Sequence, residues 1–239
     1  MFGGLADVVW PRICEMCGRQ SDRPGRHVCS ECLMRIPFLP TQGCCRVCGR
    51  SAAASAVEFV CDNCQGARAP AFDRAASAVR FEGAAREALL RFKFRRRLYL
   101  RDDFVDWMEA ALNARFDVSA VDAVLPMPST FLRRLARGYD QCEILASDLA
   151  KRIGRSCLAR AIGRRGMPKR QAELSAEERF ENAKGTFRVR DASAVRGRTL
   201  LLVDDIMTTG ATLSECARTL KAAGAWRVWC VTAARSMRE

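Results

Sequence analysis

Four CxxC pairs lie within the first 64 residues of this chain of 239 residues. A CxxC turn directs two thiolates at one cation, and two such turns complete the shell of four sulfurs that is typical of structural Zn²⁺. Eleven residues separate the first two pairs and twelve separate the last two, which indicates an internal duplication and predicts two zinc ions. The eight predicted ligands are Cys14, Cys17, Cys29, Cys32, Cys45, Cys48, Cys61 and Cys64. Because so short a segment cannot fold on its own apolar area, the metal would hold it together.

Disulfides and redox CxxC motifs are the alternatives to zinc sites. A cytosolic setting disfavours disulfides, and four tandem pairs without a βαβ context disfavour a redox motif. The grouping stays open: sequential ribbons (14/17/29/32 and 45/48/61/64) are the simplest scheme, and an interleaved one fits the spacing too. Cys44 is a ninth thiol, but the CxxC spacing favours Cys45. His27, the only histidine, could replace a cysteine ligand, although a surface ring is the simpler expectation.

Beyond this segment the chain has the composition of a globular protein. Hydrophobic residues make up 49% of it, enough for a substantial core. The other four cysteines lie singly in apolar contexts and are predicted to be small core residues: Cys142, Cys157, Cys216 and Cys230. No apolar run approaches the roughly 20 residues of a membrane span, and the first residues do not resemble a signal peptide. We therefore expect a soluble, cytoplasmic protein without membrane insertion.

The net charge of +13 comes mostly from arginine, since the chain has only five lysines. Residues 80–101 carry eight basic against two acidic residues, and residues 151–190 carry twelve against four. Arginine grips phosphate through planar, bidentate hydrogen bonds, so such patches suit polyphosphates or nucleic acid. For any single patch, a solvated arginine-rich surface is an equally good explanation.

Strand and helix patterns alternate from residue 72 onward, after a boundary near residues 69–73. Apolar runs and period-2 patterns predict strands at 75–81, 121–126, 156–162, 184–190, 199–203 and 226–233. Helical periodicity predicts helices at 83–96, 98–113, 140–153 and 211–223. This alternation predicts an α/β domain with a mostly parallel, twisted sheet at residues 69–239, preceded by the cysteine-rich module at 1–68.

The stretch "LLLVDDIMTTGATL", residues 200–213, places two acids and a threonine-rich turn between a buried strand and a helix. The N–H groups of such a turn point outward at a helix N-terminus and would stabilise a phosphate dianion. Asp204 and Asp205 would repel that phosphate, so we expect them to hold neutral hydroxyl donors such as those of a ribose. A sugar 5-phosphate satisfies both halves of the motif. A strand, turn and helix with solvent-facing aspartates is the non-functional alternative.

This stretch resembles the phosphoribosyl pyrophosphate (PRPP) motif of type I phosphoribosyltransferases. The resemblance implies that Asp204 and Asp205 form the catalytic pair that holds the ribose hydroxyls. It implies that the 5-phosphate is cradled by Thr208, Thr209, Gly210, Ala211 and Thr212. The sheet would then be of the type I phosphoribosyltransferase kind.

In such enzymes pyrophosphate leaves C1 of the ribose, and Mg²⁺ with arginine or lysine stabilises its charge. A basic segment follows one predicted strand and precedes a helix, which is a suitable place for pyrophosphate. Its candidate residues are Arg133, Arg134, Arg137 and Gly138. Arg170 and Arg179 lie in a polar connection that could close over the site as a lid.

Three further stretches resemble the ComF family, in which a double zinc ribbon precedes a phosphoribosyltransferase domain. They are residues 71–94, 124–141 and 170–187, behind the cysteine pairs. Tyr139 and Asp140 stand where the family commonly has Phe-Asn, and residues 169–171 read Lys-Arg-Gln where Pro-Pro-Gln is common.

The resemblance implies a PRPP-binding, phosphoribosyltransferase-like protein linked to DNA uptake, natural transformation or nucleotide metabolism. The alternative is a non-catalytic factor that binds single-stranded DNA and uses the fold for a ligand or a phosphate. Phe92, Phe94 and Tyr99 could stack on bases, although at helical spacing they are more often core residues. A scaffold that docks a helicase-like DNA-uptake protein through its ribbons is a third hypothesis. The zinc module and residues 75–113 are the candidates to cover an acceptor base.

Overall fold

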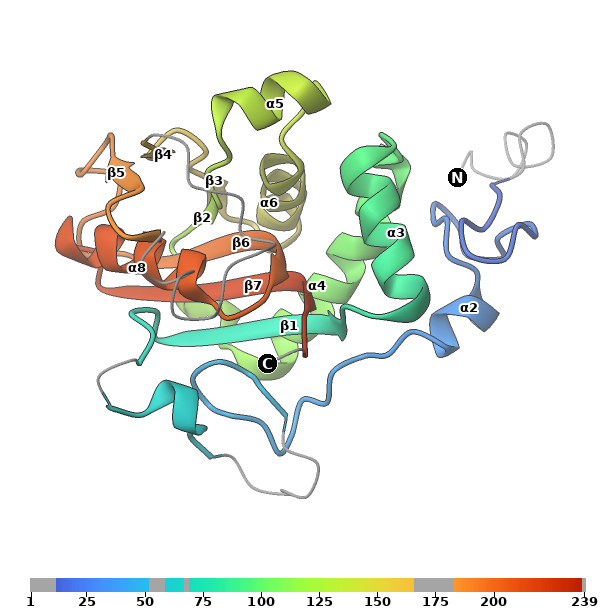
Figure 1. Ribbon diagram of the computed structural model, residues 1–239, viewed down its shortest axis with the longest axis horizontal. Coiled ribbons are helices and arrows are strands. Elements are labelled where there is room, and N and C mark those ends of the chain that lie inside the picture. The colour runs from blue at the N-terminus through green and yellow to red at the C-terminus, as the bar shows by residue number, and fades with distance from the viewer. Residues whose placement is uncertain (1–11, 52–58, 67–68, 166–182, 238–239) are drawn as a thin grey trace.

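The computed structural model describes residues 12–51, 59–66, 69–165 and 183–237, and its centre is a five-stranded sheet (Figure 1). All neighbouring strands run parallel, in the order β1-β7-β6-β2-β3. The strands are β1 (Arg74–Arg80), β2 (Ala123–Pro126), β3 (Ser156–Cys157), β6 (Thr199–Met207) and β7 (Arg227–Arg235). A parallel sheet needs crossovers that cover both of its faces, and the helices supply them. The predicted mostly parallel α/β sheet is confirmed.

Two apolar cores lie on opposite faces of the sheet. Helices α3, α4 and α6 contribute to one core, and α8 fills the other. The helices are α2 (Ser30–Met34), α3 (Gly83–Phe94), α4 (Arg101–Arg115), α5 (Phe131–Arg137), α6 (Gln141–Arg152) and α8 (Ala211–Ala222), with 3-10 turns at Asp62–Cys64, Leu98–Leu100 and Val118–Ala120. A separate antiparallel pair, β4 (Ile162–Arg164) and β5 (Phe187–Val189), contacts α8. Within the described ranges, no helix is long and apolar enough to cross a membrane.

Strand β6 is the central strand of the sheet, and its side chains are apolar on both faces of the sheet. Leu200, Leu201, Leu202 and Val203 are all fully buried, and successive side chains enter opposite cores. A strand covered on both faces requires such a continuous apolar run. The two acids that follow this run are therefore positioned by a strand that is buried on both faces.

Most predicted elements match the structure within a few residues, and three differ. The strand predicted at 199–203 continues through both acids to Met207, because β7 pairs with it as far as Arg235. The strand predicted at 156–162 is two strands in different sheets, β3 and β4. Helix α5 occupies residues 131–137, where no helix is predicted; its leucine, arginine and alanine residues favour a helix, and Gly138 follows it with φ of 79°.

The first cysteine cluster is anchored to α4 by buried charge. Asp103, fully buried on α4, accepts hydrogen bonds from the Arg23 guanidinium (2.9 Å) and from the backbone N–H of His27 (2.8 Å). One turn further, Asp106 pairs with Arg26 and with Arg152 of α6. A buried carboxylate needs such partners, so these contacts fix the first ribbon on the helical layer.

The second cysteine cluster packs against the other side of the sheet, at β1 and β7. The backbone N–H of Ala75 donates to Val47 O at 2.6 Å, and the Arg235 guanidinium donates to Cys48 O. Gly49 has a φ of 71°, and a Cβ there would lie 2.7 Å from Ala75 O. Only glycine allows this backbone to approach so closely. The first ribbon therefore packs into the core on one face of the sheet, and the second ribbon packs into the core on the opposite face.

Candidate functional site

The carboxyl end of β6 leads through a short turn into α8. Gly210 is the N-cap of α8 with φ of 81°, and a Cβ there would lie 2.9 Å from Met207 Cε. The left-handed backbone favours glycine at this position, and a Cβ would in addition displace the flexible end of the Met207 side chain. The Thr209 hydroxyl, one residue before the N-cap, accepts a hydrogen bond from the N–H of Ala211 (3.3 Å) and so stabilises the turn. The turn directs the N-terminus of a twelve-residue helix at the sheet edge.

A cavity of about 270 Å³ lies at this edge. From β6, the turn and α8 it is lined by Asp204, Asp205, Thr208, Gly210, Ala211 and Thr212. From the end of β2 it is lined by Met127, Pro128 and Ser129. Lys93 of α3, Gln141 and Cys142 of α6, and Arg164 of β4 complete its polar wall. Ligands of parallel α/β sheets bind at this carboxyl edge.

The acid pair is held by a lysine. Lys93 Nζ lies 2.7 Å from Asp205 Oδ2, and Gln141 Nε2 donates to the same oxygen at 3.2 Å. Burial alone would raise the pKa of Asp205, but the charge and hydrogen bond of Lys93 lower it below the ordinary value. Asp205 is therefore ionised at neutral pH.

Asp204 behaves differently from its neighbour. Burial, followed by the charge of Asp205, raises the pKa of Asp204 to about 7. Its Oδ1 atom accepts from Cys142 Sγ (3.2 Å) and from the backbone N–H of Asp205 (2.9 Å). The cavity thus offers one ionised and one partly protonated carboxyl group. Both line the cavity, so their internal partners do not turn them away from it.

The structure brings together most of the residues predicted for the ribose and the 5-phosphate. Thr208, Gly210, Ala211 and Thr212 line the same cavity as the two acids, whereas the Thr209 hydroxyl accepts from the backbone N–H of Ala211 within the turn. These binding roles stay predictions.

Three of the four residues predicted to bind pyrophosphate lie outside the cavity lining. Arg134 is exposed on α5, the Arg137 guanidinium lies 5.2 Å from the centre of the Phe94 ring, and Gly138 follows the helix. None of these three lines the cavity; the side chain of Arg133 and all of Arg170 and Arg179 are outside the described residues. The segment that does reach the cavity from β2 is residues 127–129. The pyrophosphate role of the arginines stays a prediction.

Sequence reasoning missed Lys93 and Gln141. Cys142 is a buried core residue, as predicted, and it also lines the cavity. One signal was available for Lys93: it is one of five lysines in a chain with 40 basic residues. A lysine at such a position is a compact charge, suited to a single carboxylate oxygen. Gln141 is the last residue of the stretch 124–141 that resembles the ComF family, but the resemblance was not used to give it a role.

The eight paired cysteines form two clusters, one from 14/17/29/32 and one from 45/48/61/64, with the sulfurs of each within 4.8 Å of one another. The structure thus favours the sequential grouping. Tetrahedral Zn–S bonds of about 2.3 Å place sulfurs about 3.8 Å apart; the Cys17–Cys29 and Cys48–Cys61 sulfurs are 3.7 and 3.6 Å apart. This donor set fits two zinc ions. The His27 ring packs against Tyr99 instead, with 4.2 Å between the ring centres.

We predict that the purified chain contains two equivalents of zinc and that Cys14→Ser and Cys45→Ser each lower the content to about one, because each removes one of four sulfurs. Elemental analysis measures the ratio. Cys44→Ser is the matched control, since Cys44 Sγ contacts the carbonyls of Pro40 and Gln42 rather than a cluster. A loss of zinc in this control would contradict the ligand set.

We predict that Asp204→Asn stabilises the protein at neutral pH. The pKa of Asp204 in the folded chain, about 7, is above that of an unfolded aspartate, so the folded state keeps a proton that the unfolded state releases. Stability therefore falls as pH rises through the window from about 4 to 7. The substitution removes this loss, and a gain of about 1 kcal/mol would raise the Tm by about 2–4 °C at pH 8.

Thermal unfolding at pH 5 and pH 8 measures the effect, which is larger at pH 8. Asp205→Asn is the control with the opposite sign, because it leaves the Lys93 ammonium buried without its partner. A lower Tm for Asp204→Asn than for the wild type at pH 8 would contradict the raised pKa of Asp204.

Comparison with known proteins agrees with this geometry. Residues 140–239 match the phosphoribosyl transferase domain family, and residues 5–65 match the double zinc ribbon domain family. The first match includes β6, the turn and α8; the second includes both cysteine clusters.

Three relatives extend the comparison. Competence protein F of Haemophilus influenzae is 25% identical over 203 residues, which are 82% of this chain and 85% of that protein. Competence protein ComFC of Bacillus subtilis is 26% identical over 222 residues, 90% of this chain and 83% of that protein. DNA utilization protein YhgH of Escherichia coli is 33% identical over 112 residues, 46% and 48% of the two chains. A double zinc ribbon ahead of a phosphoribosyltransferase-type domain, together with relatives named as competence proteins, confirms the predicted resemblance to the ComF family.

Proposed function

We propose that the cavity at the end of β6 binds PRPP with Mg²⁺ and that the protein is a phosphoribosyltransferase acting in DNA utilization or nucleotide metabolism. One observation carries this proposal: a single cavity joins the acid pair of β6 to the N-terminal turn of α8. The turn suits the 5-phosphate, and the acids suit the ribose hydroxyls.

The electrostatics of the cavity support the same ligand. Helix α8 offers the positive end of its dipole to a phosphate dianion. The Lys93 charge offsets that of Asp205, so the acid pair repels an approaching polyphosphate less than two free carboxylates would. The partly protonated Asp204 reduces the repulsion further.

The leaving pyrophosphate would lie toward the end of β2. Residues 127–129 enter the cavity there, and the Ser129 hydroxyl donates to Asp140, the N-cap of α6. Carboxylate oxygens and phosphate oxygens are the ligands that Mg²⁺ prefers, so the ion would bind together with PRPP. Transfer then needs little more than positioning and charge stabilisation at C1 of the ribose.

The PRPP proposal is tested by calorimetry of the full chain with PRPP and Mg²⁺. We expect wild-type binding and a loss of about tenfold to a hundredfold in affinity for the variant with Asp204→Asn and Asp205→Asn, because charge-assisted hydrogen bonds are lost. Asp102→Asn, an aspartate on α4 away from the cavity, is the matched control and should bind normally. Pyrophosphate release against a panel of bases and nucleic acids tests transfer. Equal PRPP affinity in the wild type, the double variant and the control would contradict the proposed site.

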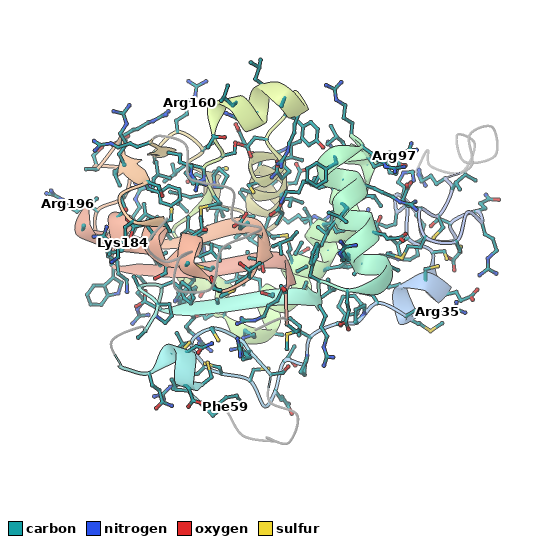
Figure 2. All side chains as sticks on the ribbon, in the orientation of Figure 1. Arg35, Phe59, Arg97, Arg160, Lys184 and Arg196 are labelled. Carbon is teal, nitrogen blue, oxygen red and sulfur yellow. The ribbon has the colours of Figure 1, made fainter. Side chains whose placement is uncertain are left out.

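Single-stranded DNA binding is the second candidate, supported by an exposed rim beside the cavity. Phe94, at the end of α3, is 64% exposed, and residues 95–97, three arginines, are exposed after it. Figure 2 shows Arg97 at the molecular surface beside this end of α3. Phe92 is fully buried and the Tyr99 hydroxyl donates to Glu15, so Phe94 is the aromatic ring that a base could stack on. A helicase-like partner stays a prediction.

We predict that single-stranded DNA binds with an affinity that falls as salt rises, because arginines displace counterions from phosphates. A fluorescence titration at several salt concentrations measures the slope. Phe94→Ala should weaken binding by about fivefold or more through lost stacking and leave the slope unchanged. Arg96→Ala and Arg97→Ala together should reduce the slope. A slope near zero in the wild type would exclude phosphate contacts.

A further inference from the structure

Gln141 is the first residue of α6, and its amide orientation is fixed by the acid pair. The side chain is buried, with 5% of its surface exposed, and Nε2 donates to Asp205 Oδ2 at 3.2 Å. The opposite orientation would place Oε1 against a carboxylate oxygen, an acceptor against an acceptor. The network therefore directs Oε1 away from Asp205.

Gln141 Oε1 has no hydrogen-bond donor among the described residues, although the atom is buried. Buried acceptors in folded proteins are almost always satisfied, and leaving one unmet is costly. Gln141 lines the cavity. The missing donor is thus expected from a ligand in this cavity.

One oxygen of each neighbouring carboxylate already accepts two hydrogen bonds. Asp205 Oδ2 accepts from both Lys93 and Gln141, and Asp204 Oδ1 accepts from Cys142 and the Asp205 N–H. A sugar with two adjacent hydroxyl groups brings two donors to these crowded acids. A neutral third acceptor can take one of them without adding negative charge beside a phosphate.

We propose that the cavity takes a sugar phosphate with two vicinal hydroxyls, a ribose 5-phosphate rather than a 2-deoxyribose 5-phosphate unit, and that Gln141 Oε1 accepts from one hydroxyl. The inference rests on the proposed PRPP site and deepens it, because it names a specificity-determining residue outside the acid pair and the turn. A site built to accept from a hydroxyl rejects the analogue that lacks it. The sugar of a DNA strand is then a poor ligand for this cavity.

Calorimetry with ribose 5-phosphate and its 2-deoxy and 3-deoxy analogues tests the inference on the full chain. We expect the wild type to prefer ribose 5-phosphate over one deoxy analogue by about tenfold or more. Gln141→Met keeps the volume and removes the acceptor, so it should abolish that preference by weakening ribose 5-phosphate alone. Gln141→Leu provides a second variant, and the Tm of each shows that it is folded.

Lys93→Met is the matched control, because it removes the other donor to Asp205 Oδ2 and leaves Gln141 Oε1 in place. It should weaken all three sugars by similar factors and keep their ratio. An unchanged ratio in both Gln141 variants, with ribose 5-phosphate still bound, overturns this inference alone. A wild type that binds none of the three sugar phosphates and no PRPP overturns the proposed function together with it.

Discussion

The ion pair between Lys93 and Asp205 is the interaction on which the site depends. Two adjacent carboxylates at the end of a fully buried strand would repel each other and lose hydration. Lys93 keeps Asp205 ionised, whereas Asp204 has a pKa raised to about 7 and is partly protonated at neutral pH. Because Lys93 comes from α3, this helix must lie across the carboxyl edge of the sheet. The buried apolar face of α3, which includes Leu89 and Phe92, packs the helix in this place.

The two cysteine clusters, similar in sequence, have different structural settings. The first is tied to α4 through Asp103 and Asp106, whereas the second meets β1 and β7 through Gly49 and Arg235. The duplication therefore produced two modules of one kind that cover opposite sides of one sheet. Charge fixes the first and close backbone packing fixes the second.

The sequence predicts what is local and misses what is distant. The cysteine spacing of each cluster, the apolar run of β6 and the turn before α8 are each encoded in one short stretch of sequence, and they agree with the structure. Lys93 and Gln141 meet Asp205 only because α3 and α6 fold over the same edge. Helix α5 replaces an expected loop because its helix-forming residues outweigh the pattern that placed arginines beside a strand end. These side-chain contacts join residues 64 and 112 positions apart, a separation that leaves no periodic pattern in the sequence.

Arg235, at the end of the last strand, is only 3% exposed. Its guanidinium donates to Cys48 O, and it also lies 3.6 Å from Met207 Sδ, three residues before Gly210. One side chain thus connects the second cysteine cluster with the end of β6, just before the turn that lines the cavity. A fragment that begins after the cysteine clusters would keep Arg235 but lose its Cys48 partner, and would leave a buried guanidinium without that acceptor beside the residue that precedes the turn.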